Sequence, residues 1–222
     1  MSDRHSGSRP GGLLGICVAG LVVLAVLLGG CRSVNPLSGF GLGQSKEEEG
    51  RIRGLMKWHS GRVEVYRDFR TVFTARAIFI SEELRLAVVD WEARSRLLSP
   101  AERDILERET NKGGDNTVRV LLGFYTPDGA FNDLDKEGTS WIPYIRNADG
   151  SVVRASCLGL GEEEGKIYMR FLQWDMSWSR LYMLCFSYGP DMRKPGEEWI
   201  DLVISSPWGS GEMRLKTASP RG

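Results

Sequence analysis

The sequence predicts a mainly β fold: an immunoglobulin-like β-sandwich with an inserted pair of helices, spanning residues 51–222. Three observations predict it. Eight or nine short segments are rich in β-branched and aromatic residues, turn signals separate most of them, and one stretch near the start has helical spacing instead. Seven tryptophans and eight phenylalanines supply large side chains for the core of such a sandwich.

The predicted strands follow one another at short intervals. The first alternates Val63 and Val65 with charged neighbours, and the turn "TPDG" (126–129) ends the third. The segment "NADG" (147–150) is a typical hairpin signal between the fourth and fifth strands. The expected strands are residues 62–69, 71–80, 116–125, 140–146, 151–160, 166–174, 180–188, 198–205 and 211–216.

Two segments predict helices and form the insert, residues 82–112. Residues 99–114 have Ser99 as N-cap, Pro100 in the first turn, Glu102 completing a capping box and Gly113 as a stop. Residues 81–98 place apolar side chains at helical spacing, although a strand through Leu84, Leu86 and Val88 remains an alternative. We expect the insert to project from a sandwich edge, with candidate buried positions at Leu84, Val88, Trp91, Ile105 and Leu106.

The first thirty residues have the parts of a secretory signal. A polar head with Arg4 and Arg9 precedes an uncharged run from Leu13 to Leu28, and small residues end the run. Sixteen residues in a helix reach about 24 Å, short of the roughly 30 Å hydrocarbon core of a bilayer. Counting the flanking glycines makes the span marginal, so a single transmembrane anchor remains the alternative.

The end of this run, Leu28-Gly29-Gly30-Cys31, resembles the lipobox of bacterial lipoprotein precursors. The resemblance implies that the Cys31 thiol receives a diacylglyceryl group and that a peptidase then removes residues 1–30. It also implies an envelope protein anchored to the outer membrane and facing the periplasm, because Arg32 stands where an aspartate would favour the inner membrane. Residues 32–50 are rich in glycine, serine and charge, so residues 31–50 read as the lipidated cysteine and a flexible tether.

A second resemblance covers residues 75–145. The order of "ARAIFISEELR", "FYTPDGAFNDLDKEG" and "SWIPYI" is similar to uncharacterised proteobacterial lipoproteins. This resemblance implies a location and assigns no functional residue.

The charge balance argues against nucleic acid as a partner. Removing residues 1–30 takes away two basic residues and one acidic one, which leaves 27 basic and 28 acidic residues. No basic stripe follows any segment. We expect no cofactor and no metal site.

Most motifs that could carry chemistry are incomplete. His59 is the one histidine after residue 30, no G-x-S-x-G elbow accompanies it, and we expect it at the surface. The segment "GLGEEEGKI" (159–167) lacks the glycine and the hydroxyl residue of a phosphate loop. Two further candidates stay open: a non-helical calcium loop at Asp133, Asp135, Glu137 and Gly138, and a sugar-stacking platform of Trp174, Trp178 and Tyr182.

Cys157 and Cys185 form an even pair once Cys17 leaves with the signal and Cys31 is acylated. An oxidising compartment permits a disulfide between them, which would close a loop of about 29 residues and stabilise the fold by roughly 3.6 kcal/mol. Two free, buried thiols are the alternative.

The functional prediction is a lipid-anchored envelope protein with a non-catalytic binding or assembly role and an unidentified protein partner. The alternative is a periplasmic hydrolase dependent on a metal or on carboxylates, because aspartate and glutamate are plentiful although no pair is singled out by spacing.

Overall fold

A computed structural model describes residues 45–111, 114–147, 149–160, 165–174, 177–188 and 198–218. The chain divides into two compact units, Met1–Gly43 and Gln44–Gly222, and the described residues belong to the second. The strands are β1 (Ser60–Arg67), β2 (Arg70–Phe79), β3 (Thr117–Tyr125), β4 (Ile142–Arg146), β5 (Val152–Arg154), β6 (Cys157–Leu160), β7 (Arg180–Ser187), β8 (Trp199–Ser206) and β9 (Gly209–Lys216). The helices are α2 (Ser45–Trp58), α3 (Glu82–Ser95), α4 (Pro100–Thr110) and α5 (Lys166–Met169), with single 3₁₀ turns η3 (Gly114–Asn116) and η4 (Gly129–Phe131).

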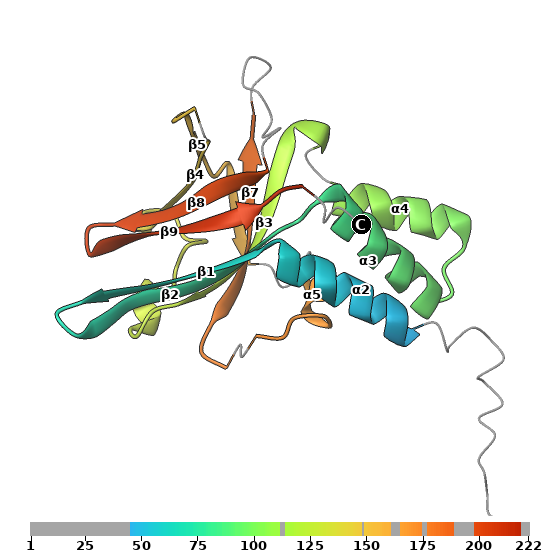
Figure 1. Cartoon of the computed structure of the whole chain (residues 1–222), viewed down its shortest axis with the longest axis horizontal. Coiled ribbons are helices and arrows are strands. Elements are labelled where there is room, and N and C mark those ends of the chain that lie inside the picture. The colour runs from blue at the N-terminus through green and yellow to red at the C-terminus, as the bar shows by residue number, and fades with distance from the viewer. Residues whose placement is uncertain are drawn as a thin grey trace, which may run out of the picture. The chain divides into compact units, whose positions relative to one another are not determined.

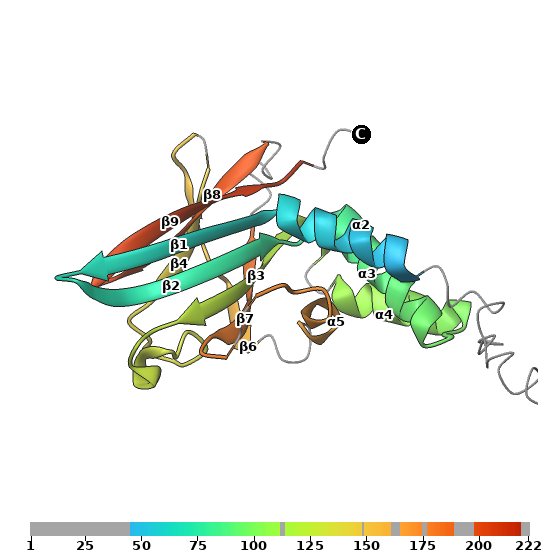
Figure 2. The same ribbon diagram turned by 60° about the horizontal axis from the view of Figure 1, so that its bottom comes forward.

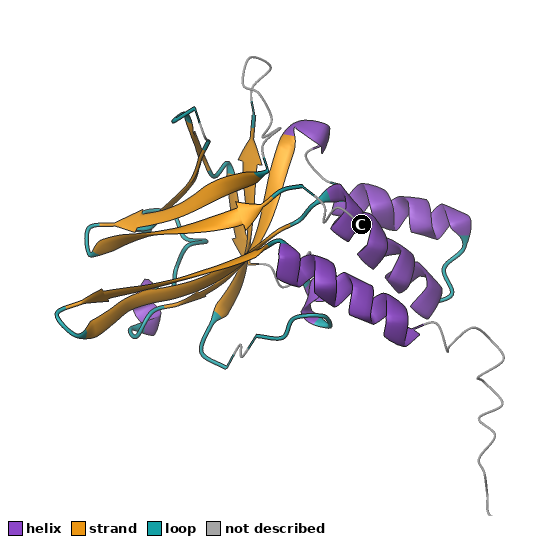
Figure 3. Cartoon of the chain, in the orientation of Figure 1, coloured by secondary structure: helices purple, strands orange, loops and turns teal. Residues whose placement is uncertain are grey.

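The strands form two antiparallel sheets (Figures 1 and 3). The first has the order β1-β2-β3-β7-β6 and the second the order β5-β4-β8-β9. Alternate side chains of both sheets meet in one apolar core, because successive residues of a strand point to opposite faces. From β2 this core takes Phe73, Ala75 and Ala77, and from β8 it takes Ile200, Leu202 and Ile204. The fold is therefore mainly β, as the sequence predicts.

A second core lies on the other face of the first sheet, at one end of its strands. There α2 and α3 cover Ile78 of β2 and Leu121 of β3. From α3, Leu84, Val88 and Trp91 are buried, which confirms these three predicted core positions. Helix α3 of the insert therefore packs on a sheet face, and the expectation that the insert projects from a sandwich edge is wrong for this helix.

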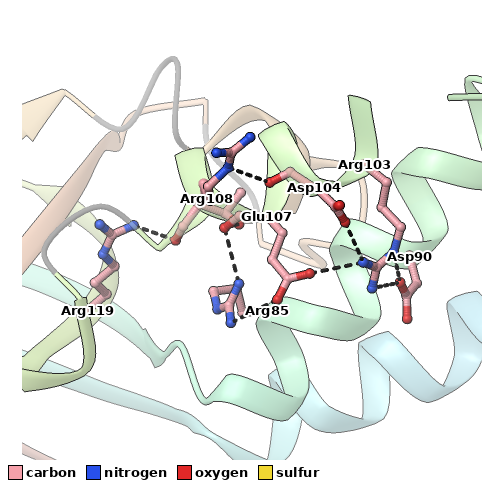
Figure 4. Close-up of polar contacts among 8 residues, drawn as sticks. Arg85, Asp90, Arg103, Asp104, Glu107, Arg108 and Arg119 are labelled. Atoms are coloured by element: carbon pink, nitrogen blue, oxygen red, sulfur yellow. Dashed lines mark hydrogen bonds and ion pairs between the residues drawn. The ribbon is translucent and has the colours of Figure 1, made fainter. Parts of the chain in front are cut away.

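Helix α4 buries no residue and is held by polar contacts (Figure 4). Two buried arginines reach the carbonyl oxygens of its last turn: Arg85 Nη1 donates to Glu107 O at 3.3 Å and Arg119 Nη1 to Thr110 O at 2.6 Å. The last carbonyls of a helix lack backbone amide partners within it, and Glu107 O also accepts from Thr110 Oγ1 at 2.9 Å. Cations are favourable near a helix C-terminus. Arg103 of α4 also binds Asp90 of α3, with 2.9 Å between Nε and Oδ1.

Strands β1 and β9 are edge strands of different sheets, and their backbones pass close together. A Cβ on Gly211 would lie 2.7 Å from Val65 Cγ2, and a Cβ on Gly61 would lie 3.0 Å from the carbonyl oxygen of Arg214. Ordinary side chains do not fit at such separations. The glycines let the two sheets meet along this side.

Several predicted elements are confirmed. The segments at 62–69, 71–80, 116–125, 140–146, 180–188, 198–205 and 211–216 match β1, β2, β3, β4, β7, β8 and β9 within three residues. Strands β4 and β5 pair antiparallel, with Arg146 opposite Val152, as the predicted hairpin requires. Helices α3 and α4 are present, and the capping box of Ser99 and Glu102 is complete.

Three expectations differ from the structure. Residues 151–160 are two strands, because the chain leaves the second sheet after β5 and joins the first at β6. Residues 166–174 form the short α5 and irregular chain, since Tyr168 and Phe171 both turn into the second core. Residues 45–50, predicted as the end of the tether, form the start of α2. This helix forms because Ile52, Leu55 and Met56 are buried at helical spacing.

Ile105 and Leu106 are not buried as predicted. Ile105 is exposed, and Leu106 is half-buried. The reason is that α4 attaches to α3 and β3 through arginines, so its apolar side chains have no sheet to cover.

The strand register places Cys157 of β6 directly opposite Cys185 of β7. Cys185 is disulfide-bonded. The strand register makes Cys157 its candidate partner, and this pairing has a direct chemical test.

We expect no free thiol in the mature lipidated protein when it is denatured without reductant. The Cys31 sulfur is then a thioether, and Cys157 and Cys185 are joined. Reduction should expose two thiols per chain and lower the free energy of unfolding by roughly 3.6 kcal/mol. Reaction of the denatured protein with a thiol reagent before and after reduction checks this, and two thiols before reduction would contradict the pairing.

Candidate functional site: an aromatic cavity between two hairpin turns

A cavity of about 500 Å³ opens at one end of the two sheets. The turns of the β1–β2 and β8–β9 hairpins lie at this end, away from α2, α3 and α4, in two views of the molecule (Figures 1 and 2). Its volume is in the range of small-ligand sites. The lining comes from the β1–β2 turn, the segment from β3 through η4, the start of β4 and the β8–β9 turn: Arg67, Asp68, Arg70, Thr71, Val72, Thr126, Pro127, Asp128, Phe131, Trp141 and Trp208.

Three aromatic side chains form the apolar part of this cavity. Trp208 packs edge-on against Phe131, with 4.7 Å between ring centroids, and lies 5.5 Å from Trp141. The Trp141 indole Nε1 donates a hydrogen bond to the Phe131 carbonyl at 2.6 Å. Trp141 also contacts Phe73 and Phe124 of the core, at 5.3 and 5.0 Å. The aromatic wall is thus continuous with the packed interior, which holds it in place.

The β1–β2 turn forms a basic rim. Arg67 and Arg70 are register partners on either side of it. Asp68 and Phe69 occupy the turn with φ angles of 50° and 62°. A left-handed conformation is unfavourable for a residue such as phenylalanine. Residues held in unfavourable backbone conformations cluster at functional sites. Phe69 is fully exposed as a result, so the turn displays an apolar ring beside two guanidinium groups.

The two arginines differ in their partners. Arg67 Nε lies 3.9 Å from Asp68 Oδ2. Within the ranges that the structure describes, the Arg70 side chain has neither a hydrogen bond nor an ion pair. Arg70 is therefore a cation at the cavity rim whose charge no described residue neutralises.

The two carboxylates of the lining have local roles. Asp128 Oδ1 accepts a hydrogen bond from the Ala130 amide at 2.9 Å and so caps η4, while Asp68 faces Arg67. Among the described residues, no group of three or more histidine, cysteine, aspartate or glutamate side chains could hold a metal ion. The cavity has the features of a recognition site: an apolar wall, a basic rim and few polar groups.

None of the candidate site residues predicted from the sequence is among the residues that line this cavity. Cys31 is outside the described residues, and Cys157 and Cys185 lie on β6 and β7. In the acidic loop, Asp133 Oδ1 accepts from Thr139 Oγ1 at 3.0 Å, and one buried Asp135 oxygen has no hydrogen-bond partner among the described residues. The predicted aromatic platform is divided, since Tyr182 is buried in the core and donates to Asn132, whereas Trp174 and Trp178 line a different hollow.

His59 is fully buried, so the surface position predicted for it is wrong. Its Nδ1 donates to the Lys216 carbonyl at 2.6 Å, because a carbonyl can only accept. Its Nε2 then accepts from Ser81 Oγ at 3.0 Å, and Ser81 Oγ in turn accepts from the Leu84 amide at the start of α3. The histidine thus links the C-terminal end of β9 to α3, and the hydroxyl beside it is a helix cap.

Burial lowers the pKa of His59 below its ordinary value of about 6.5, although the Lys216 carbonyl and Glu83 oppose this effect. The unfolded chain therefore binds a proton at a pH where the folded chain does not. Stability is complete above pH 6.5 and is lost as the pH falls from 6.5 toward the lower folded pKa.

We expect the wild-type chain to lose stability between pH 6.5 and 5.5, by at most about 1.4 kcal/mol per pH unit, relative to His59→Gln. Glutamine offers a donor and an acceptor but does not titrate. Urea denaturation of both proteins across this range measures the difference. Since His59 is the one histidine after residue 30, parallel pH profiles for the two proteins would contradict the assignment.

Sequence reasoning missed the cavity residues because they come from four separate segments. One signal was available: Trp208 stands in the turn "SPWGS", where small and polar residues are usual. Phe69 in the turn "RDFR" is a second such residue.

None of the helices in the described ranges has the length and apolarity needed to span a membrane.

Comparison of the chain with models of protein families, with curated proteins and with solved structures found no match in any of the three.

Proposed function

We propose that the chain is a lipid-anchored, non-catalytic binding module of the bacterial cell envelope, and that the aromatic cavity is its binding site. The motif Leu28-Gly29-Gly30-Cys31 supports the anchor. The observation that carries the binding role is the cavity itself, with its aromatic wall and its basic rim of Arg67 and Arg70. The anchor would be in the outer membrane with the domain in the periplasm, as Arg32 favours.

The order of the strands supports an immunoglobulin-like β-sandwich. In that fold one sheet has the strand order A-B-E-D, and the other contains C-F-G, with C′ beside C in some members. Setting aside β1, the first sheet reads β2-β3-β7-β6 and the second β5-β4-β8-β9, which correspond to A-B-E-D and C′-C-F-G. Trp141, buried just before β4, stands near the position of the buried tryptophan on strand C.

The position of the cavity suits a tethered receptor. The polypeptide enters the domain at the start of α2, whereas the hairpin turns that line the cavity lie at the other end (Figures 1 and 2). Helix α2 has 14 residues and β1 has 8, so they measure about 21 and 26 Å in length. The cavity thus lies at the end of the domain farther from α2.

The lining indicates the chemistry of the partner. Phe131, Trp141 and Trp208 would receive an apolar side chain, and Arg67 and Arg70 would bind a carboxylate next to it. We therefore propose a protein partner that presents an exposed segment with an aromatic or large aliphatic residue adjacent to aspartate or glutamate.

Selection of peptides on the full-length protein in detergent micelles tests the proposal. From a random heptapeptide library we expect enrichment of sequences that pair an aromatic or aliphatic residue with an acidic one. The double variant R67E/R70E should instead select peptides with lysine or arginine, because the rim then carries the opposite charge.

The matched control is R51E/R53E, which makes the same change of charge on α2, at the other end of the domain. It should select the same peptides as the wild-type protein. The proposal fails if no peptide is enriched, or if R67E/R70E selects the wild-type set.

A further inference from the structure

The outer face of the first sheet has a second hollow that is separate from the aromatic cavity. Helices cover one end of this face, over Ile78 and Leu121. At the other end a hollow of about 280 Å³ lies over β1, β2 and β3, and the segment before β7 forms its wall. We call it the Trp178 hollow, and its principal residues are Arg62, Thr74, Arg76, Tyr125, Trp174 and Trp178.

Two arginines lie side by side in the floor of the Trp178 hollow. The register pairs Arg62 of β1 directly with Arg76 of β2, so their Cβ atoms are about 4.5–5.5 Å apart. Like charges at such positions destabilise a sheet. Glu64 forms an ion pair with Arg62, but the half-buried Arg76 side chain has no hydrogen bond or ion pair among the described residues. A bound anion would remove this repulsion.

The wall of the hollow is aromatic. Trp178 is 80% exposed, more than any other tryptophan among the described residues. Trp174 lies half-buried beside the same hollow. Gly123 of β3 is the register partner of Arg76. It has no side chain, so it leaves a gap in the floor of the hollow. An indole face left open to solvent next to a gap in the floor suits a flat ring with an apolar face.

The polar groups narrow the ligand class further. Thr74, Tyr125 and Ser179 bring hydroxyl groups to the hollow, and each hydroxyl can donate and accept. A guanidinium group binds a carboxylate through two parallel hydrogen bonds. Glu64, close to Arg62, would repel a polyanion, and the chain is neutral overall with no basic stripe for a phosphate backbone.

We propose that the Trp178 hollow binds an acidic saccharide. The C–H face of a pyranose ring packs on Trp178, its carboxylate binds Arg76, and its hydroxyls bind the threonine, serine and tyrosine hydroxyls. This site is independent of the aromatic cavity, since the two share no lining residue.

Calorimetry on the full-length protein in detergent micelles tests the site. The probes are a tetrasaccharide of alternating glucuronic acid and N-acetylglucosamine and, as the uncharged counterpart, a tetramer of N-acetylglucosamine. We expect saturable binding of the acidic probe, at least tenfold tighter than that of the neutral one. Trp178→Ala and Arg76→Gln should each weaken binding of the acidic probe tenfold or more. Arg76→Lys should weaken it by less than Arg76→Gln does.

A tryptophan and an arginine on the other sheet supply the control. Arg214 Cζ lies 5.0 Å from the ring centroid of Trp199, on the other sheet, so Trp199→Ala and Arg214→Gln make the same changes elsewhere. They should leave binding unchanged, and urea denaturation of all the variants checks that they fold. The proposal is overturned if the acidic probe does not bind or if both probes bind equally well. It is also overturned if the control variants lose as much affinity for the acidic probe as Trp178→Ala and Arg76→Gln. Tighter binding of a single-stranded pentanucleotide with the same dependence on Trp178 and Arg76 would also overturn it.

Discussion

Replacing Cys31 by serine is expected to abolish acylation completely and to leave an uncut precursor of 222 residues. The lipobox resemblance gives the reason: the thioether to diacylglycerol forms only on a thiol, and the peptidase acts on the acylated chain. Labelling of growing cells with a radioactive fatty acid measures the loss. Mass spectrometry of the accumulated protein shows whether residues 1–30 are still attached.

The chain carries its own control for this experiment. Cys17 lies in the same apolar segment but follows the bulky Ile16, so Cys17→Ser should be acylated and cut as the wild-type protein is. Normal labelling and cutting of Cys31→Ser would refute the lipobox assignment.

Trp91→Ala is expected to lower the free energy of unfolding by about 3–5 kcal/mol. Trp91 of α3 is buried against Phe171, with 5.1 Å between the ring centroids, and Arg170 Cζ lies 4.9 Å from the centroid of the indole. Removing the indole would leave a cavity in the core between the helices and the first sheet. Urea denaturation followed by circular dichroism measures the loss.

Ile105→Ala on α4 is the matched control. Because Ile105 is exposed, its truncation should change the free energy of unfolding by no more than about 0.5 kcal/mol. Similar losses in both variants would show that the two helices contribute equally to the core, contrary to the packing of α3 and the polar attachment of α4.

Local patterns predicted most of the secondary structure correctly, because the relevant signals are short-range. Ser99, Pro100 and Glu102 specify the start of α4 within four residues of sequence, and Val63 and Val65 mark β1 by alternation. Helix α2 was missed although its signal exists. Ile52, Leu55 and Met56 have helical spacing, but Gly50 and Gly54 lower the helix propensity of the segment.

The failures come from contacts between distant parts of the chain. Residues 166–174 alternate like a strand, yet Tyr168 and Phe171 are drawn into the core below the helices. His59 is buried because Lys216, 157 residues further along the chain, supplies its hydrogen-bond acceptor. The cavity takes Phe131, Trp141 and Trp208 from three segments, so no single local pattern could show that they meet. The tryptophan in the β8–β9 turn and Phe69 in the β1–β2 turn were the available signals.

The close approach of β1 and β9 has a consequence for aggregation. An exposed edge strand offers unpaired amides and carbonyls to which a strand of another molecule can add. Here the long edge of each sheet lies against the other, and the opposite edges, β6 and β5, have only four and three residues. Neighbouring copies at high concentration would therefore find little free edge to extend. A larger side chain at Gly211 would separate β1 from β9 and open both long edges at once, so self-association should accompany the loss of stability.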